Sequence, residues 1–400
     1  MAYPGIRAAV ADRRARAVSV SRAIHADPEL ALREHRSSAL LQDWLRDEGF
    51  TVAAGVAGLD TAFVGEWGTG RPRIAFMAEY DALPGIGHAC GHNLIASGGL
   101  LAAAAVRAEL ERTGAAGTVV VIGTPGEEGA GGKVIELDAG VFDGVDAAMM
   151  FHPADRTILT RRMLACLHFD VHFHGVAAHA AKNPADGRSA LAAMLLFFNG
   201  VDALRQHAGD GSRMHGIITD GGQAPNIVPE HTSATFIVRD VTLERAQALA
   251  ERVYEVARGA AAMTGTRTEI VPTSPPYAHL NSNHTMAARV GEHLATLGHP
   301  HEAPSPTDGT GSTDAGNVSL AVPTVHPFMQ IADRGTPGHS RVFAQASGTE
   351  RAEEAMVAMA TALAGLGWDL FTSPTLLAEA TEEFRAGGHD PAAALEAVIA

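Results

Sequence analysis

Short apolar runs alternate with helical segments through the first part of the chain. The runs at 73–78 (RIAFMA), 117–122 (GTVVVI) and 145–151 (VDAAMMF) are typical of strands that are covered on both faces. Residues 94–110, between the first two runs, are rich in Ala and Leu and have a helical pattern. If the strands are parallel neighbours joined by helices, their carboxyl ends meet at one crevice, where open α/β sheets bind ligands.

A different pattern begins near Arg162. Residues 165–174 (ACLHFDVHFH) and 232–239 (TSATFIVR) alternate apolar and polar positions, as half-exposed antiparallel strands do. Further elements expected in this segment are helices at 189–206 and 243–263 and strands at 216–219 and 268–271. The resulting β-α-β-β-α-β order predicts an inserted α+β domain of ferredoxin-like type, whose edge strand would be open to self-pairing.

The flanking segments predict one α/β domain that the insert interrupts. We expect its first part at 1–165, the insert at 166–273 and its second part at 274–400. Its sheet is expected to be mixed and mainly parallel, with helices on both faces. Other elements expected in it are helices at 6–24, 30–48, 286–297 and 347–366 and strands within 51–66 and at 323–328.

The composition is that of an ordinary soluble globular protein. Of 400 residues, 46% are hydrophobic and 19% are charged, which favours a large core and roughly two domains. A formal net charge of -15 argues against nucleic acid or an anionic membrane as a partner. No signal-peptide pattern opens the chain, and no segment reaches the roughly 18 to 20 apolar residues of a membrane span. We therefore expect a cytoplasmic protein whose two cysteines are reduced thiols.

Each of the three apolar runs ends in residues that suit metal binding or acid–base chemistry. Cys90 and His92 follow the first run, Glu127 and Glu128 follow the second, and His152 follows the third. The proline after His152 is expected to end the third strand directly behind the imidazole. One such ending could arise by chance, whereas three in succession indicate a functional crevice.

The chemistry of the first ending has more than one interpretation. Gly91 relaxes the backbone between Cys90 and His92, so that both side chains can converge. A thiolate beside an imidazole suits a transition metal. The same residues would also suit a cysteine hydrolase, with Cys90 as nucleophile and His88 or His92 as base. A binding protein without catalytic activity is the third alternative.

These segments resemble the M20 family of metallopeptidases, specifically its amidohydrolase subfamily. The closest likeness is to the branch that contains p-aminobenzoyl-glutamate hydrolase and a dipeptidase for β-alanyl dipeptides. It implies a zinc-peptidase-like catalytic domain and an inserted lid domain through which the protein forms a homodimer. The segments that carry the likeness are DPEL (27–30), YDALPGIGHACGHN (80–93), GTPGEEG (123–129), FHP (151–153), HAAKNPADGRSAL (179–191), GGQAPNIVP (221–229), GSTDAGNVS (311–319) and the late His339.

The resemblance implies a site for two divalent metal ions. Cys90 would bridge the two ions, His92 and His152 would complete the coordination of one, and Glu128 and His339 that of the other. The thiolate and the carboxylate would leave about two positive charges to act on an amide carbonyl and a hydroxide. Thiolate ligation favours zinc, and imidazole and carboxylate also accept manganese or cobalt.

Two further roles follow from the same resemblance. Glu127 would be the general base, although an exchange of roles with Glu128 stays open, and Asp81 would orient a metal-binding histidine from behind. His339 lies in the sequence GTPGHSRVF, which departs from the usual surroundings of the late histidine, so His326 competes with it. The expected reaction is hydrolysis of the amide bond of a small dipeptide or an N-acyl or N-aroyl amino acid. Cleavage of another C–N bond is the alternative.

Residues that contact the substrate are expected in and beside the insert. The resemblance implies that His179 reaches the active site of the partner subunit. Arg239 could hold a free carboxylate of the substrate, or form an ion pair with the acidic residues that follow it. Asn226 lies in a rigid loop between two prolines, and Ser312 lies in a glycine-rich loop that could shape the pocket wall.

Overall fold

The chain forms two compact units. The computed structural model describes residues 3–305 and 311–387. Within these ranges, unit 1 comprises residues 3–162, 280–305 and 314–387, and unit 2 comprises residues 163–279 and 311–313. The segment expected to be a loop at 307–317 lies partly outside the described residues, and its described end already begins a helix at Ala315.

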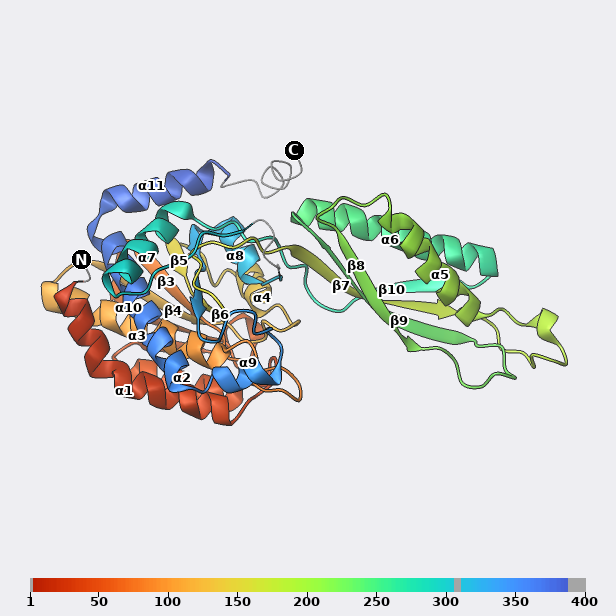
Figure 1. Cartoon of the computed structure of the whole chain (residues 1–400), viewed down its shortest axis with the longest axis horizontal. Coiled ribbons are helices and arrows are strands. Elements are labelled where there is room, and N and C mark those ends of the chain that lie inside the picture. Colours follow the sequence, from red (N-terminus) through yellow and green to blue (C-terminus); the bar gives the residue numbers. More distant parts are fainter. Residues whose placement is uncertain (1–2, 306–310, 388–400) are drawn as a thin grey trace. The chain divides into compact units, whose positions relative to one another are not determined.

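Unit 1 is built on a six-stranded mixed sheet with the strand order β1-β2-β4-β3-β5-β11 (Figure 1). The four strands from β4 to β11 in this order are parallel, β2 pairs antiparallel with β4, and β1 pairs antiparallel with β2. The prediction of parallel neighbours with helical crossovers is therefore confirmed. The strands are β1 (Thr51–Ala54), β2 (Phe63–Thr69), β3 (Arg73–Ala78), β4 (Gly117–Gly123), β5 (Ala147–Met149) and β11 (Thr324–Val325).

Helices cover both faces of this sheet because both sets of alternate strand residues are apolar. Ile74 and Phe76 of β3 pack into the larger core, whereas Ala75 and Met77 pack into a smaller core on the other face. The helices of unit 1 are α1 (Pro4–Ala26), α2 (His35–Asp47), α3 (His92–Thr113), α4 (Gly132–Asp138), α7 (His284–Thr296), α8 (Ala315–Ala321), α9 (Arg341–Ala346), α10 (Glu350–Thr372) and α11 (Pro374–Arg385).

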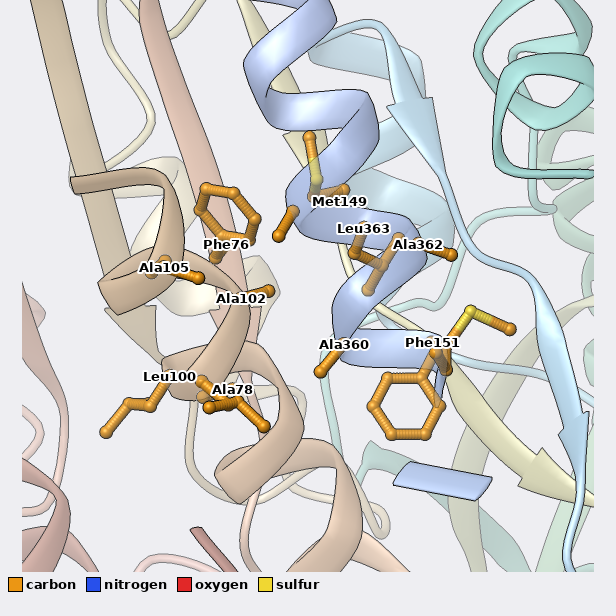
Figure 2. Close-up of a cluster of buried hydrophobic side chains, with 14 of the residues drawn as sticks. Phe76, Ala78, Leu100, Ala102, Ala105, Met149, Phe151, Ala360, Ala362 and Leu363 are labelled. Carbon is orange, nitrogen blue, oxygen red and sulfur yellow. The ribbon is translucent and has the colours of Figure 1, made fainter. Parts of the chain in front are cut away.

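The helices α3 and α10 form the centre of the larger core. Figure 2 shows Ala102 of α3 and Ala360 of α10 in one buried cluster that also contains Phe76 and Phe151. By length and composition both helices could cross a membrane, which corrects the expectation that no segment is apolar enough. Other parts of the protein bury 89% and 83% of their most apolar windows, because alanine-rich surfaces let core helices pack closely.

The end of the third strand differs from the prediction. β5 ends at Met149, and His152 begins a separate short strand, β6 (His152–Ala154), which pairs in parallel with β12 (Phe328–Gln330). Pro153 therefore does not end extended structure. A two-stranded sheet consists only of edges, so a residue without an N–H group can be accommodated there. The run expected at 323–328 is likewise divided between β11 and β12.

Unit 2 has the expected β-α-β-β-α-β order. Its four strands form an antiparallel sheet in the order β10-β7-β9-β8, and α5 and α6 lie on one face of it (Figure 1). On β7, Phe169, Val171 and Phe173 are buried against these helices, and the residues between them face the other way. The elements are β7 (Ala165–His174), α5 (Ala190–Arg205), β8 (Arg213–Asp220), β9 (His231–Asp240), α6 (Leu243–Thr264) and β10 (Arg267–Pro272).

Candidate metal and catalytic site

The loop after β3 brings Cys90 and His92 to the carboxyl end of the unit 1 sheet. Gly91, between them, has a φ of 77°, in the left-handed region that favours glycine. A Cβ atom at Gly91 would lie 2.7 Å from Cγ of Pro153, which is closer than real Cβ contacts. This position therefore requires glycine. The left-handed conformation of Gly91 lets the side chains of Cys90 and His92 point toward the same site at the start of α3.

Cys90, His92 and His152 form the first group of possible metal ligands, with one ligand atom of each within 4.8 Å of the others. The Nδ1–H of His152 donates to the Pro153 carbonyl at 2.6 Å, so its Nε2 is left for a ligand. Nε2 of His92 is buried without a hydrogen-bond partner. Such an orphaned imidazole nitrogen, beside a sulfur and a second imidazole, fits a transition metal such as zinc.

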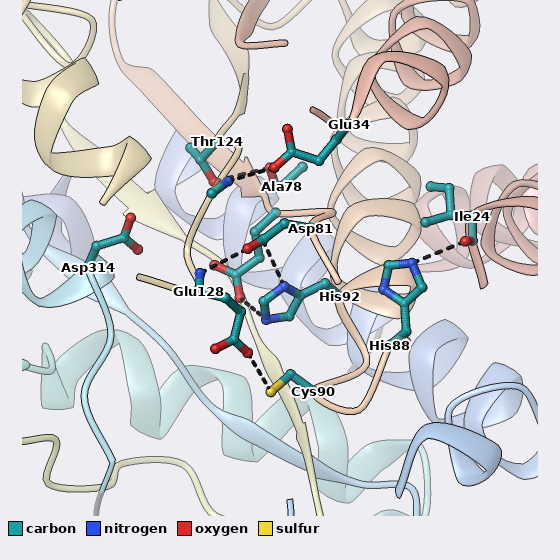
Figure 3. Close-up of polar contacts among 12 residues, drawn as sticks. Ile24, Glu34, Ala78, Asp81, His88, Cys90, His92, Thr124, Glu128 and Asp314 are labelled. Carbon is teal, nitrogen blue, oxygen red and sulfur yellow. Dashed lines mark hydrogen bonds and ion pairs between the residues drawn. The ribbon is translucent and has the colours of Figure 1, made fainter. Parts of the chain in front are cut away.

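Cys90, Glu128 and His339 form a second group of the same compactness, so Cys90 belongs to both. Sγ of Cys90 donates to Oε1 of Glu128 at 2.8 Å (Figure 3). That oxygen lies 3.6 Å from Nε2 of His339. His339 has a φ of 53°, which is uncommon outside glycine, and its amide donates to the Ala89 carbonyl. Backbone strain of this kind is often found at functional sites.

Asp81 connects the two groups. Its Oδ1 accepts a hydrogen bond from Nδ1 of His92 at 3.0 Å, and its Oδ2 accepts one from the backbone amide of Glu128 at 2.9 Å (Figure 3). Burial opposes ionisation of Asp81, but the neighbouring His92 lowers its pKa below the usual value. The structure thus places Asp81 behind a predicted ligand, in the position that the sequence suggested.

Glu127 lies beside these groups without joining Cys90. One of its carboxylate oxygens is within 4.8 Å of ligand atoms of His92 and Glu128. Burial, followed by the charge of Glu128, raises the pKa of Glu127 well above its usual value. The shift favours the neutral acid, and positive charge beside Glu127 would favour the ionised carboxylate.

Sequence reasoning missed a buried ionic cluster formed by Lys133, Glu79 and Asp314. Nζ of Lys133 donates to Glu79 at 2.6 Å and to Asp314 at 2.7 Å, and all three side chains are buried. Glu79 also lies 3.4 Å from Nε2 of His92. Although burial opposes it, Lys133 lowers the pKa of Glu79 to about 2. One signal was available, because Lys133 is one of only two lysines in the chain.

The competing residues occupy different positions. His326 is buried, and its ring centre lies 6.0 Å from that of His152, but His339 is the histidine that groups with Cys90 and Glu128. His88 donates from Nε2 to the Ile24 carbonyl at 3.1 Å (Figure 3), and burial lowers its pKa to about 3. Burial also raises the pKa of Cys90, which argues against a free thiolate nucleophile.

The predicted substrate residues form two pairs within unit 2. His179 forms an isolated β-bridge with Ile227, and the neighbouring Ala180 amide donates to the Asn226 carbonyl at 3.0 Å, so these two exposed loops run together. Nη1 of Arg239 donates to Oγ of Ser312 at 2.6 Å. The alternative for Arg239 was an ion pair with the acidic residues that follow it. Of these, Asp240 pairs with Arg245 instead.

Comparison with known proteins places this arrangement in context. A family model described as peptidase family M20/M25/M40 matches residues 75–366. The Xaa-Arg dipeptidase of Mus musculus is 35% identical over 381 residues, which cover 92% of this chain and 88% of that protein. A p-aminobenzoyl-glutamate hydrolase subunit of Escherichia coli (strain K12) is 32% identical over 453 residues, covering 95% of this chain and 94% of that protein.

A solved structure shares the fold. The Bacillus subtilis YXEP protein, described as a dinuclear metal-binding peptidase of the M20 family, superposes with a TM-score of 0.67 and 22% identity. The superposition covers 90% of this chain and 99% of that one. At this identity the likeness concerns the fold, whose mixed sheet and helices are those of M20 peptidases.

Proposed function

Because this chain belongs to peptidase family M20/M25/M40 and is a hydrolase that acts on amide bonds, we propose that it cleaves small dipeptides or N-acyl or N-aroyl amino acids at a site for two divalent metal ions. The observation that carries this proposal is the pair of ligand groups that share Cys90. One shared sulfur, with nitrogen and oxygen donors on either side, is what a bridged pair of cations requires.

The ligands are assigned from these two groups. His92 and His152 would hold one ion with Cys90, and Glu128 and His339 would hold the other. A thiolate makes zinc the first choice, with manganese or cobalt as alternatives. When bound, such ions lower the pKa of water and polarise an amide carbonyl.

Glu127 is the general base of the proposed reaction. It takes a proton from the attacking water and returns it to the nitrogen of the leaving amine, so that the carboxylate ends the cycle unchanged. Burial and Glu128 raise the pKa of Glu127, and nearby cations would lower that pKa and so favour the ionised carboxylate that accepts a proton. Oε1 of Glu128 accepts a hydrogen bond from Cys90, and Glu128 groups with Cys90 and His339, so we assign Glu128 rather than Glu127 as the metal ligand.

Unit 2 supplies the proposed substrate contacts. The names of the two relatives describe a dipeptidase and an aroyl-glutamate hydrolase, whose substrates end in a free carboxylate. Arg239, held by Ser312, would bind that carboxylate, and Asn226 would hydrogen-bond the substrate. His179 would reach the active site of the other subunit of a dimer. Cleavage of another C–N bond by the same residues is the second candidate, and a substrate screen by mass spectrometry separates the two.

We also propose that unit 2 forms a homodimer through β8. This strand is one edge of the sheet and exposes Ile217 and Ile218, which are 67% and 40% accessible. The other edge, β10, carries Arg267 and Glu269 and ends in Pro272, which are features that discourage pairing. Ile217→Lys should give a monomer by light scattering, and Val271→Lys on β10 should not.

The central test is the Glu127→Gln variant. It should bind as many metal ions per chain as the wild type, as measured by elemental analysis, while kcat falls roughly 10² to 10⁴-fold. Glu128→Gln is the matched variant and should lose metal as well as activity. Retained turnover in Glu127→Gln would reject the assigned base, and activity that resists chelators but is blocked by a thiol alkylator would favour the cysteine hydrolase.

A further inference from the structure

Three histidines meet on the face of the unit 2 sheet that lies opposite α5 and α6. His172 and His174 are outward-facing residues of β7, and His231 of β9 is the cross-strand partner of His174. The ring centre of His231 lies 5.5 Å from that of His172 and 5.3 Å from that of His174. The remaining pair is 6.3 Å apart, so the three imidazoles form a triangle.

A carboxylate fixes the orientation of His231. Its Nδ1–H donates to Oδ2 of Asp220, on β8, at 2.9 Å. This bond leaves Nε2 as the acceptor nitrogen, and Nε2 lies 3.2 Å from Nδ1 of His172. An imidazole with a carboxylate behind it and its other nitrogen facing a second imidazole has the arrangement found in histidine metal sites.

His174 stands in the same relation to a second carboxylate. Its Nε2 donates to Oε2 of Glu269, on β10, at 3.2 Å, which leaves Nδ1 as the nitrogen for a ligand. The His174 side chain is 33% exposed, so its ring can turn without displacing the core of the unit. The two orienting carboxylates come from the outer strands, and the three histidines come from the inner ones.

One of the three histidine pairs already has the spacing of a metal site. At the usual Zn–N distance of roughly 2.0 to 2.1 Å, two nitrogens on one tetrahedral ion are about 3.3 Å apart and their ring centres about 5 Å apart. The His172–His231 pair already has this separation, with 3.2 Å between its nitrogens. Binding would require His172 to move its proton from Nδ1 to Nε2, and His174 to turn its ring toward the ion.

We propose that His172, His174 and His231 bind one transition-metal dication, such as Zn²⁺ or Ni²⁺, in addition to the two ions of the catalytic site. The ligands and their carboxylates come from all four strands of the sheet, so the bound ion would hold the strands together. An ion at concentration c that binds the folded sheet and not the unfolded chain stabilises the fold by RT ln(1 + c/Kd), so the unfolding temperature should rise with the concentration of the ion. This site is independent of the proposed function.

The test counts metal ions bound to the full chain. Wild-type protein and the double variant His172→Asn/His231→Asn are dialysed against micromolar Zn²⁺ or Ni²⁺ and measured by elemental analysis and calorimetry. The matched control is His207→Asn/His215→Asn, which removes two exposed histidines of the same unit. We expect wild type and control to bind one more ion per chain than the double variant, with amide hydrolysis equal in all three.

Three outcomes would overturn the proposal. These are an equal metal count in wild type and double variant, an equal loss in the control, and an extra ion that binds only at millimolar concentration. Electron paramagnetic resonance with Cu²⁺ gives an independent reading, because coupling to several imidazole nitrogens should be present in wild type and lost in the double variant. Since the readouts are stoichiometry and spectra, they do not depend on whether the catalytic assignment holds.

Discussion

The molecule contains two groups of histidines with carboxylates behind them, and the two are assembled differently. In unit 1, loops at the carboxyl ends of parallel strands deliver side chains from distant parts of the sequence, and Asp81 orients His92 in a buried place. In unit 2, the register of two antiparallel strands sets the histidines side by side, and Asp220 orients His231 on a half-exposed face. Loops at strand ends can bring sulfur, nitrogen and oxygen ligands together in a buried site. The face of the unit 2 sheet brings together only histidine nitrogens, and these are partly exposed.

Only the buried group in unit 1 should need a neighbouring cation to balance its carboxylates. The substitution Lys133→Met, which removes that cation, is expected to have the largest effect on stability. Removing the ammonium leaves Glu79 and Asp314 as buried carboxylates without their cation, which should cost about 3 to 5 kcal/mol of folding free energy. Urea unfolding of the metal-free protein measures the loss. The other lysine, the exposed Lys182, is the control, and its change to Met should have no measurable effect.

The second largest effect on the unfolding free energy should come from the titration of Glu34. Its Oε1 accepts a hydrogen bond from the Gly126 amide. Burial, with Asp81 second, raises its pKa to about 7. Because the pKa of Glu34 in the folded protein is above its unfolded-state value near 4.5, the protonated carboxyl stabilises the fold below pH 4.5. This contribution to the unfolding free energy is lost as the pH rises through 7. The unfolding free energy should fall by about 3 kcal/mol through this titration.

The Glu34→Gln variant isolates this contribution. Unfolding free energies of wild type and variant are compared between pH 4.5 and 7.5, because the difference between the two profiles cancels the other titrating groups. The unfolding free energy of the wild type minus that of Glu34→Gln should decrease across this interval. The control Glu111→Gln, at an exposed helical position, should have the same pH profile as the wild type. Parallel profiles for wild type and Glu34→Gln would contradict the assignment.

Asp81→Asn should weaken metal binding roughly 10 to 100-fold, because Nδ1 of His92 loses the carboxylate that orients it. Competition with a chromogenic chelator measures the affinity. The matched change on the other unit, Asp220→Asn, should leave the affinity of the two catalytic ions as it is. Equal effects of both substitutions would mean that the two groups of histidines are not independent.

The smallest expected effect is that of Asp220→Asn on the metal-free protein. Its bond to His231 joins two partly exposed side chains, with 39% and 44% of their surfaces accessible, so solvent compensates for its loss. The thermal unfolding midpoint should stay within experimental error of the wild-type value. A clear decrease would show that the unit 2 group already stabilises the sheet without metal.

Much of unit 1 could be predicted from sequence because its strands are marked by apolar runs. The bounds expected for β3 agree with the structure, and the residues that follow β3 and β4 do meet at one edge. Local patterns were misleading at Pro153, since a short partner strand elsewhere in the chain accommodates this residue. The identity of that partner is a tertiary fact that no local pattern contains.

The buried ionic cluster and the unit 2 histidines escaped prediction for related reasons. Lys133 and Asp314 are 181 positions apart, and nothing near either residue indicates the other. The alternation of β7 shows which side chains share a face, but their meeting with His231 depends on the register of β9. Sequence patterns thus identify faces and strand ends, whereas pairing between distant segments fixes which charges and rings touch.

The exposure of His339 bears on how the protein would be loaded with metal. Its side chain is 62% accessible, whereas His92 is buried at 1%. The ion that it shares with Cys90 and Glu128 would therefore lie nearer to solvent and exchange sooner than its neighbour. Metal exchange would therefore begin at the outer ion.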